Sequence, residues 1–495
     1  MIPKWPLGAA GRSRLSGVRN KVRATGWIGQ KWEVQDAYRP SLWRKLSAPQ
    51  LFVTSFALLI LVGTLGLKTL PGLYTGEPLG WLDALFTATS AVCVTGLIVA
   101  DTATYFTPAG QAWILLLIQL GGLGMITFAT MIILALGGRL SLRHEALSSA
   151  ATNITSHVDH RQLTRDLIKF TLVFEAVGAL ILYLLWIPRF GFGGAIWHAI
   201  FHAVSAFCNA GFSTFSNSLM DFQRSPLALS IVMALIVAGG LGFLTLEELY
   251  LRRGARGRGR PLRISLHSRL VLGATAALLG GGWILFTALE WRLTLAEMPI
   301  WARPLNGLFM SVTARTAGFN TIDYNAASGG TNFLTVLLMS IGGSPGSTAG
   351  GLKTTTFGLI GLLAWSRLRS RRIASLGDRS VPEETVQRAV GLFVFAFGVV
   401  TAAILGFVTL EMGTVTHSAA ARGFLPYMFE AVSAFNTVGL SMGATGELSR
   451  PSLVLTILLM FIGRIGPLTF ASAVVLRPTT GRGRYRFAYE DVVVG

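Results

Sequence analysis

The chain has 495 residues, of which 52% are hydrophobic and only 13% are charged. A soluble domain usually carries about 25% charged residues, so this composition excludes an ordinary soluble protein and predicts a surface that faces lipid. The formal net charge is +19, but the basic residues lie mostly between apolar runs. That pattern is typical of cytoplasmic loops in a membrane protein and does not favour a nucleic-acid partner.

The N-terminal segment, residues 1–45, is rich in Lys and Arg and lacks the apolar core of a signal peptide. We interpret it as a basic cytoplasmic tail, with anchoring at the membrane interface through its Trp residues as the alternative. After it come eight apolar runs, each long enough to span about 30 Å of hydrocarbon as a helix. They are 47–67, 112–136, 167–187, 226–246, 270–289, 332–366, 389–410 and 452–476.

Between the two runs of each consecutive pair lies a shorter, weakly polar run that cannot span a bilayer. Each of these four runs predicts a re-entrant half-helix, covered at its end by protein or water. The fold predicted is an all-α integral membrane protein of four M1–P-loop–M2 repeats around one central pore, with eight spanning helices and four re-entrant pore helices. The half-helices are 81–93, 195–208, 303–315 and 424–436, and the repeats are 46–140, 160–252, 266–368 and 386–478.

Long Arg-rich loops separate the repeats, whereas the loops inside each repeat are short and mostly acidic. The positive-inside rule therefore predicts that both termini, including the tail at 479–495, are cytoplasmic. The expected location is the plasma membrane of a bacterium, in multi-pass form. The Arg-rich run at 252–263 is expected to fix topology and to contact anionic lipid.

Each half-helix ends in a similar sequence closed by a glycine: Thr95-Gly96-Leu97, Asn209-Ala210-Gly211-Phe212, Thr316-Ala317-Gly318-Phe319 and Thr437-Val438-Gly439-Leu440. Glycine permits backbone angles that other residues avoid, and rings of backbone carbonyls can replace the water of a K⁺ ion. No carboxylate lies in these segments, which favours a monovalent cation. The predicted K⁺ selectivity filter consists of Val94, Thr95, Gly96, Asn209, Ala210, Gly211, Thr316, Ala317, Gly318, Thr437, Val438 and Gly439.

A second glycine repeat follows in each unit: Gly121-Gly-Leu-Gly124, Gly239-Gly-Leu-Gly242, Gly342-Gly-Ser-Pro-Gly346 and Gly463-Arg-Ile-Gly466. Taken singly, any of these glycines is also explained by helix packing or capping. A polytopic enzyme is a competing class, but the seven histidines form no convincing cluster. His198 and His202 have the spacing of metal ligands without an evident third ligand. An organic-solute carrier would favour inverted repeats, whereas these are parallel.

With these motifs, the chain resembles the Trk/Ktr/HKT superfamily of K⁺ transporters, most closely the membrane subunit of bacterial Ktr systems (KtrB-like). The resemblance covers about residue 45 to the C-terminus, with Asn436-Thr-Val-Gly-Leu-Ser441 and Gly463-Arg-Ile-Gly-Pro-Leu-Thr469 among its motifs. It implies K⁺ uptake stimulated by Na⁺, a homodimer with one pore per subunit, and gating by a cytoplasmic ring of nucleotide-binding (RCK-type, KtrA-like) subunits. It implies no enzymatic activity and no organic cofactor.

Two features are candidates for a gate. The sixth apolar run is interrupted by a Gly-rich, Pro-containing stretch that cannot be stable helix, and the resemblance implies a mobile loop below the filter. A passive kink is the alternative. Arg464 lies inside the eighth run, aligned with Gly122, Gly240 and Gly343, where a buried charge is a functional hypothesis. The alternative is a structural pairing with a carboxylate or with a helix C-terminus. For Arg315 we expect a structural role, as a cation at the C-terminus of the third half-helix, paired with an acid such as Glu430. The gate set is Gly342, Gly343, Ser344, Pro345, Gly346, Ser347, Thr348, Ala349, Gly350, Gly351, Lys353 and Arg464.

Overall fold

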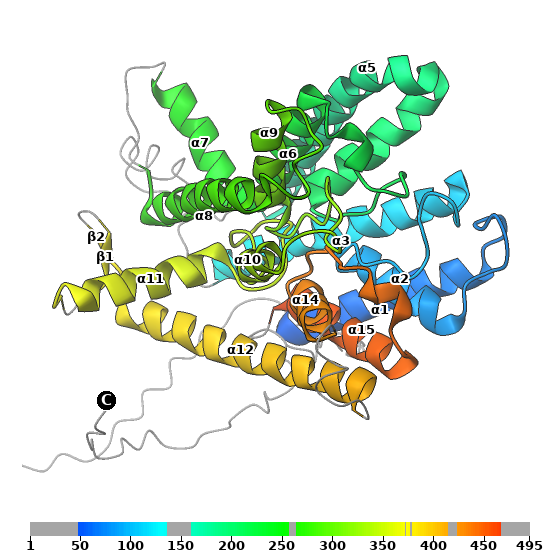
Figure 1. Cartoon of the computed structure of the whole chain (residues 1–495). Coiled ribbons are helices and arrows are strands. Elements are labelled where there is room, and N and C mark those ends of the chain that lie inside the picture. Colours follow the sequence, from blue (N-terminus) through cyan, green and yellow to red (C-terminus); the bar gives the residue numbers. More distant parts are fainter. Residues whose placement is uncertain are drawn as a thin grey trace, which may run out of the picture. The chain divides into compact units, whose positions relative to one another are not determined.

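A computed structural model describes residues 48–135, 160–256, 264–371, 373–376, 379–413 and 423–466. The chain divides into two units, Met1–Leu46 and Ser47–Gly495, and all described residues belong to the second. Both predicted tails and the Arg-rich run after residue 256 lie outside the described residues. Within them the chain is mostly helical, with a single two-stranded hairpin formed by β1 (Ser375–Leu376) and β2 (Arg379–Ser380) (Figure 1).

The described helices fall into four groups along the chain, which we call units 1 to 4. In units 1, 3 and 4 a long helix precedes a separate short helix, in unit 2 both are parts of α5 on either side of Gly191, and one or two helices follow in each unit. Unit 1 is α1 (Ala48–Thr69), α2 (Trp81–Val92) and α3 (Pro108–Ala135); unit 2 is α5 (His160–Cys208), the 3₁₀ turn η2 (Met220–Phe222), α6 (Pro226–Leu241) and α7 (Phe243–Arg256). Unit 3 is α8 (Leu266–Glu290), α9 (Ala302–Thr313), α10 (Gly329–Met339) and α11 (Thr354–Leu368); unit 4 is α12 (Glu383–Met412), α14 (Phe424–Phe435), η3 (Ala444–Glu447) and α15 (Arg450–Ile465).

Four helices of the described residues are long and apolar enough to cross a membrane. They carry many exposed large hydrophobic side chains, such as Leu61 of α1, Leu184 of α5 and Phe397 of α12, as lipid-facing surfaces require. The bent pair α6 and α7 raises the number of candidate spans to five. The four long helices that meet the criterion without the bent pair are Pro49–Thr69, Arg165–Cys208, Leu266–Glu290 and Glu383–Met412.

The fourth apolar run, 226–246, is not one straight helix as the sequence suggested. It is bent by 103° between α6 and α7, because Gly242 adopts a φ of +78°, a value that ends an α-helix. The third run and the half-helix after it were expected as separate helices, and α5 indeed consists of two helices that meet at a kink at Gly191, where φ is +70°. The eighth run ends as helix at Ile465 because Gly466 has a φ of +90°, and the run's remainder lies outside the described residues.

The units pack in a cyclic order. The last or penultimate helix of each unit lies against the short helix of the next: α3 against α5, α6 against α9, α10 against α14, and α15 back against α2. Each short helix also packs on the long helix of its own unit, as α2 does on α1 and α9 on α8. This arrangement brings the C-terminal ends of the four short helices together.

Candidate functional site

The four glycine segments, 94–96, 209–211, 316–318 and 437–439, share one unusual backbone conformation. The glycines Gly96, Gly211, Gly318 and Gly439 have φ values of +91°, +71°, +81° and +91°. The residue two places before each glycine is also left-handed, although it is not glycine: Val94, Asn209, Thr316 and Thr437. Left-handed conformations at alternate residues turn successive peptide carbonyls toward the same side. Such conformations are costly away from glycine and occur at functional sites.

The same segments form a closed ring. A Cβ added to Gly211 would lie 3.0 Å from the carbonyl oxygen of Ala317, and one added to Gly318 would lie 2.5 Å from that of Val438. A Cβ added to Gly96 would overlap the carbonyl oxygen of Ala210, and a Cβ added to Gly439 would overlap the carbonyl oxygen of Thr95. Each glycine therefore abuts the carbonyl that precedes the glycine of the next unit, in the order 1, 2, 3, 4 and back to 1. No side chain fits between neighbours.

A hydroxyl of the preceding short helix ties each glycine segment to its own unit. The backbone N–H of Gly96 donates to Ser90 Oγ, and that of Gly439 to Ser433 Oγ, both at 3.1 Å. In units 2 and 3 the hydroxyl donates instead to the carbonyl just after the glycine: Ser205 to Phe212 (2.7 Å) and Thr313 to Phe319 (2.5 Å). All four hydroxyl residues are completely buried.

The second glycine repeat brings the following helix against the end of the short helix. A Cβ at Gly121, Gly239 or Gly463 would overlap the carbonyl oxygen of Val92, Phe207 or Phe435, respectively. Unit 3 departs from this pattern. There the guanidinium of Arg315 is inserted, and it donates to the carbonyl of Gly342 at 3.2 Å and to Thr354 Oγ1 at 2.9 Å.

The segment 342–351 is not helical and is held by contacts with other units. The Ser344 and Thr348 amides donate to the carbonyls of Gly240 (2.9 Å) and Gly239 (3.2 Å) of α6, and the Gly351 amide donates to Gly463 of α15 at 3.1 Å. The side-chain amide of Asn209 is hydrogen-bonded to the Thr348 hydroxyl at 3.0 Å. The segment thus reaches the glycine segment of unit 2, and its residues Ser344, Ser347 and Thr348 are buried.

Arg464 is completely buried and links three units. Its guanidinium donates to the carbonyl of Thr348 in the 342–351 segment and to that of Gly121 on α3, the latter at 3.0 Å. In the described part of the chain no carboxylate lies within salt-bridge distance of it. Of the structural alternative, the pairing with a carboxylate therefore finds no partner there. The Lys353 ammonium donates to the backbone carbonyl of Ala349 at 2.6 Å, so Lys353 also stabilises the 342–351 segment.

The expected pairing of Arg315 with Glu430 is wrong. Glu430 is buried in α14, where it accepts from the hydroxyls of Ser441 and Thr445. The guanidinium of Arg315 instead donates its hydrogen bonds to the Gly342 carbonyl and the Thr354 hydroxyl. The guanidinium is drawn to the free carbonyls of the interrupted helix because these need donors at that depth.

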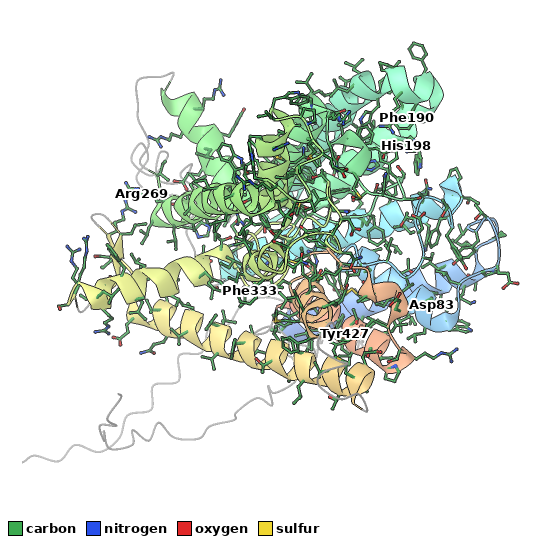
Figure 2. The ribbon with its side chains drawn as sticks, viewed as in Figure 1. Asp83, Phe190, His198, Arg269, Phe333 and Tyr427 are labelled. Atoms are coloured by element: carbon green, nitrogen blue, oxygen red, sulfur yellow. The ribbon has the colours of Figure 1, made fainter. Side chains whose placement is uncertain are left out.

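His198 and His202 do not form a metal site with other residues. Over the described ranges no group of three His, Cys, Asp or Glu residues could hold a metal ion. His202 contacts Ser213 and the backbone of His198, while His198 contacts Thr214. The rings of Phe190 and His198 lie 4.9 Å apart at the bend of α5 (Figure 2). Cys93 and Cys208 are buried free thiols.

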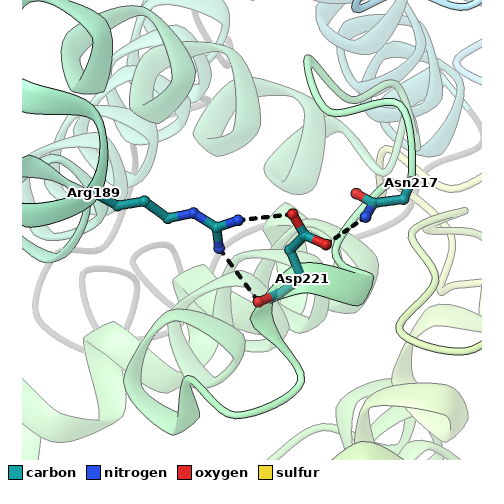
Figure 3. A network of polar contacts seen from close by, with 3 residues as sticks. All are labelled: Arg189, Asn217 and Asp221. Atoms are coloured by element: carbon teal, nitrogen blue, oxygen red, sulfur yellow. Dashed lines mark hydrogen bonds and ion pairs between the residues drawn. The ribbon is translucent and has the colours of Figure 1, made fainter.

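Beyond the glycine of unit 2, an ion pair secures the exposed connection to η2. Arg189 Nη2 lies 2.7 Å from Asp221 Oδ2, and Asn217 donates to the other carboxylate oxygen at 2.5 Å (Figure 3). The same connection also contacts both neighbouring units. The Ser216 hydroxyl donates to the Asp101 carboxylate of unit 1 at 2.5 Å, and the Leu219 amide donates to the Asn320 carbonyl of unit 3 at 3.0 Å. No sequence signal pointed to these contacts, because most of them join residues that are remote in the chain.

Comparison with known proteins identifies the family. The family model described as "TrkH: Cation transport protein" matches residues 44–479. The chain belongs to the TrkH family. Its relatives include the Potassium/sodium uptake protein NtpJ of Enterococcus hirae, 38% identical over 455 residues that cover 91% of this chain and 98% of that protein. The Ktr system potassium uptake protein B of Vibrio alginolyticus is 37% identical over 425 residues, covering 86% and 90% of the two chains.

The Ktr system potassium uptake protein B of Bacillus subtilis is 38% identical over 430 residues, which cover 86% of this chain and 93% of that protein. The fold of this TrkH-family chain also matches the crystal structure of the potassium transporter TrkH from Vibrio parahaemolyticus. The TM-score is 0.71 over 88% of this chain and 87% of that one, at 19% identity. At that identity the likeness concerns the fold alone. The resemblance to K⁺ transporters found in the sequence is confirmed.

Proposed function

We propose that this chain is the ion-translocating membrane subunit of a K⁺ uptake system, which passes K⁺ through a carbonyl-lined selectivity filter formed by the four glycine segments. The observation that carries the proposal is their closed ring, in which each glycine abuts a carbonyl of the next unit. Such carbonyls can replace the hydration shell of a K⁺ ion. The named activities of its relatives, potassium uptake and potassium/sodium uptake, agree with this.

The four units are proposed to be four M1–P-loop–M2 repeats, with the short helices as re-entrant pore helices. The long first helix of each unit provides a lipid-facing span, and α3, α6, the broken pair α10 and α11, and α15 complete the four pairs around the pore. The breaks after α6 and α10 are tolerated because they are buried in protein. The repeat boundaries are those given by the sequence, and both termini are proposed to be cytoplasmic, in a bacterial plasma membrane.

The 342–351 segment and Arg464 are proposed to be the gate. The segment is bonded to units 2 and 4, and Arg464 joins it to unit 1, so it closes the space beneath the ring. A guanidinium there raises the barrier to a cation, because the charge is poorly screened at low local dielectric. Release of the segment would require these hydrogen bonds to break together.

Regulation and assembly follow from the family resemblance alone. We propose a homodimer, stimulation by Na⁺, and a cytoplasmic nucleotide-binding ring that moves the gate. Membrane lipid is the other expected partner, with no nucleic acid and no organic cofactor.

The test is growth rescue at low K⁺ in a bacterium that lacks its own K⁺ uptake systems, with and without a co-expressed nucleotide-binding partner. We expect rescue by the natural chain and loss of rescue by Gly439→Ala, whose Cβ would strike the ring. Gly446→Ala is the matched control, because a Cβ at Gly446 meets nothing within 4 Å. Absence of K⁺ uptake by the purified, folded chain and its partner in liposomes would refute the proposal.

A further inference from the structure

Two of the four units carry an additional hydrogen-bonded link behind the glycine ring. In unit 4 the Ser441 hydroxyl, two residues past Gly439, donates to Glu430 of the pore helix α14 and accepts from the Gly443 amide at 2.9 Å. In unit 2 the Ser213 hydroxyl, two residues past Gly211, lies 2.9 Å from His202 Nε2 and accepts from the Phe215 amide at 2.9 Å. Glu430 and His202 occupy equivalent positions before their glycines.

The protonation pattern of these links follows from their partners. His202 Nδ1 lies 2.8 Å from the His198 carbonyl, which can only accept, so Nδ1 carries a proton and Nε2 of the neutral ring accepts from Ser213. Glu430 meets only donors: the hydroxyls of Ser441 and Thr445 and the amides of Met442 and Thr445. Both carboxyl oxygens of Glu430 therefore act as acceptors in this link.

Both side chains are completely buried. The His202 ring is stacked on Phe215 at 4.6 Å and lies edge-on to Trp186 at 5.2 Å. Burying a carboxylate or an imidazole is costly unless each polar atom is bonded. Replacing either link would therefore leave polar atoms without partners directly behind a glycine segment.

Units 1 and 3 have no counterpart. Their residues at the pore-helix position are Thr87 and Phe309, and Ile98 and Asn320 follow their glycines. The ring runs in the order 1, 2, 3, 4, so units 2 and 4 lie opposite each other. The two links therefore act on one diagonal of the ring.

We propose that Glu430 and His202 are positioning residues that hold this diagonal of the selectivity filter at the spacing that favours K⁺ over Na⁺. This inference rests on the filter assigned above. Each residue acts through a serine on the strand that leaves its own filter glycine, and neither touches the ion. Loss of a link lets that strand, and the carbonyls of its glycine segment, relax toward other spacings, which weakens discrimination between ions of different size.

The test measures the K⁺/Na⁺ flux ratio of purified protein in liposomes. Glu430→Gln places an amide donor among four donors, and Ser441→Ala removes the same bond from the other side. Because a hydrogen bond to a charged group is worth about a tenfold factor, we expect each change to lower the ratio by about tenfold. The double variant should be no worse than either alone. Ser441→Thr, which keeps the hydroxyl, should retain the natural ratio, and so should the control Thr87→Ser.

In unit 2, Ser213→Ala should also lower the ratio. An unchanged ratio in folded Ser441→Ala protein, or additive losses in the double variant, would overturn the proposal. If the Glu430→Gln protein does not fold, the flux ratio of Ser441→Ala alone decides whether the link supports selectivity. Gly318→Ala separates this inference from the filter itself. If that variant loses discrimination while the serine variants keep it, only the links are refuted; if it too keeps discrimination, the filter assignment falls and the links with it.

Discussion

Gly96→Ser should loosen the discrimination between K⁺ and Na⁺. Gly96 has a φ of +91°, and the left-handed region costs a residue with a side chain about 1–2 kcal/mol. The added Cβ would overlap the Ala210 carbonyl oxygen and would lie 3.1 Å from Gly211 Cα. To restore an ordinary contact, the backbone of unit 2 must move by roughly 1 Å. A substitution in unit 1 therefore displaces a carbonyl that belongs to unit 2.

Because each 1.4 kcal/mol corresponds to a factor of ten, strain of this size should lower the K⁺/Na⁺ flux ratio by about tenfold. The assay is uptake of Rb⁺ tracer into liposomes, competed by K⁺ or Na⁺, per folded molecule. Gly446→Ser is the control, because its site has open space. If Gly96→Ser protein is folded and keeps the natural Rb⁺ and Na⁺ fluxes, the carbonyl ring is not the filter.

Four further outcomes are expected. Arg464→Ala removes two hydrogen bonds from a charged donor, each worth about 1.5–3 kcal/mol, so it should raise maximal flux by roughly a hundredfold or weaken dependence on the regulatory partner; folded protein with normal or lower flux would remove Arg464 from the gate. Deletion within 346–350 should likewise raise flux in the same liposome assay, and lower flux would argue that the segment supports the pore. Tags after Ser370 and after Glu447 should label only from the cytoplasm and only from outside, respectively, and reversed labelling would overturn the four-unit topology. Asp221→Asn should lower the free energy of unfolding by less than about 1 kcal/mol in chemical denaturation, because its ion pair is half exposed; a larger loss would mean that the connection to η2 supports the fold.

The amino-acid sequence alone determined that the chain belongs in a membrane, where its short helices end and which family it resembles. Low charge and long apolar runs are properties of composition, and they survive any arrangement of the helices. The glycines at 96, 211, 318 and 439 were visible because one local requirement, a left-handed backbone, is repeated in four places. Local signals of this kind do not depend on what packs against them.

Only the tertiary structure decided which groups meet. The partners of Arg464, at Thr348 and Gly121, lie more than a hundred residues away along the chain, and no local pattern encodes that distance. The sequence suggested an acid for Arg315, because a buried charge usually needs an opposite one. It donates instead to the Gly342 carbonyl and the Thr354 hydroxyl, since the broken helix of unit 3 leaves carbonyls that need donors, and Glu430 accepts from hydroxyls of its own unit. The sharp bend at Gly242 was missed for the same reason: a glycine permits a turn, but contacts with the 342–351 segment determine that the turn is made.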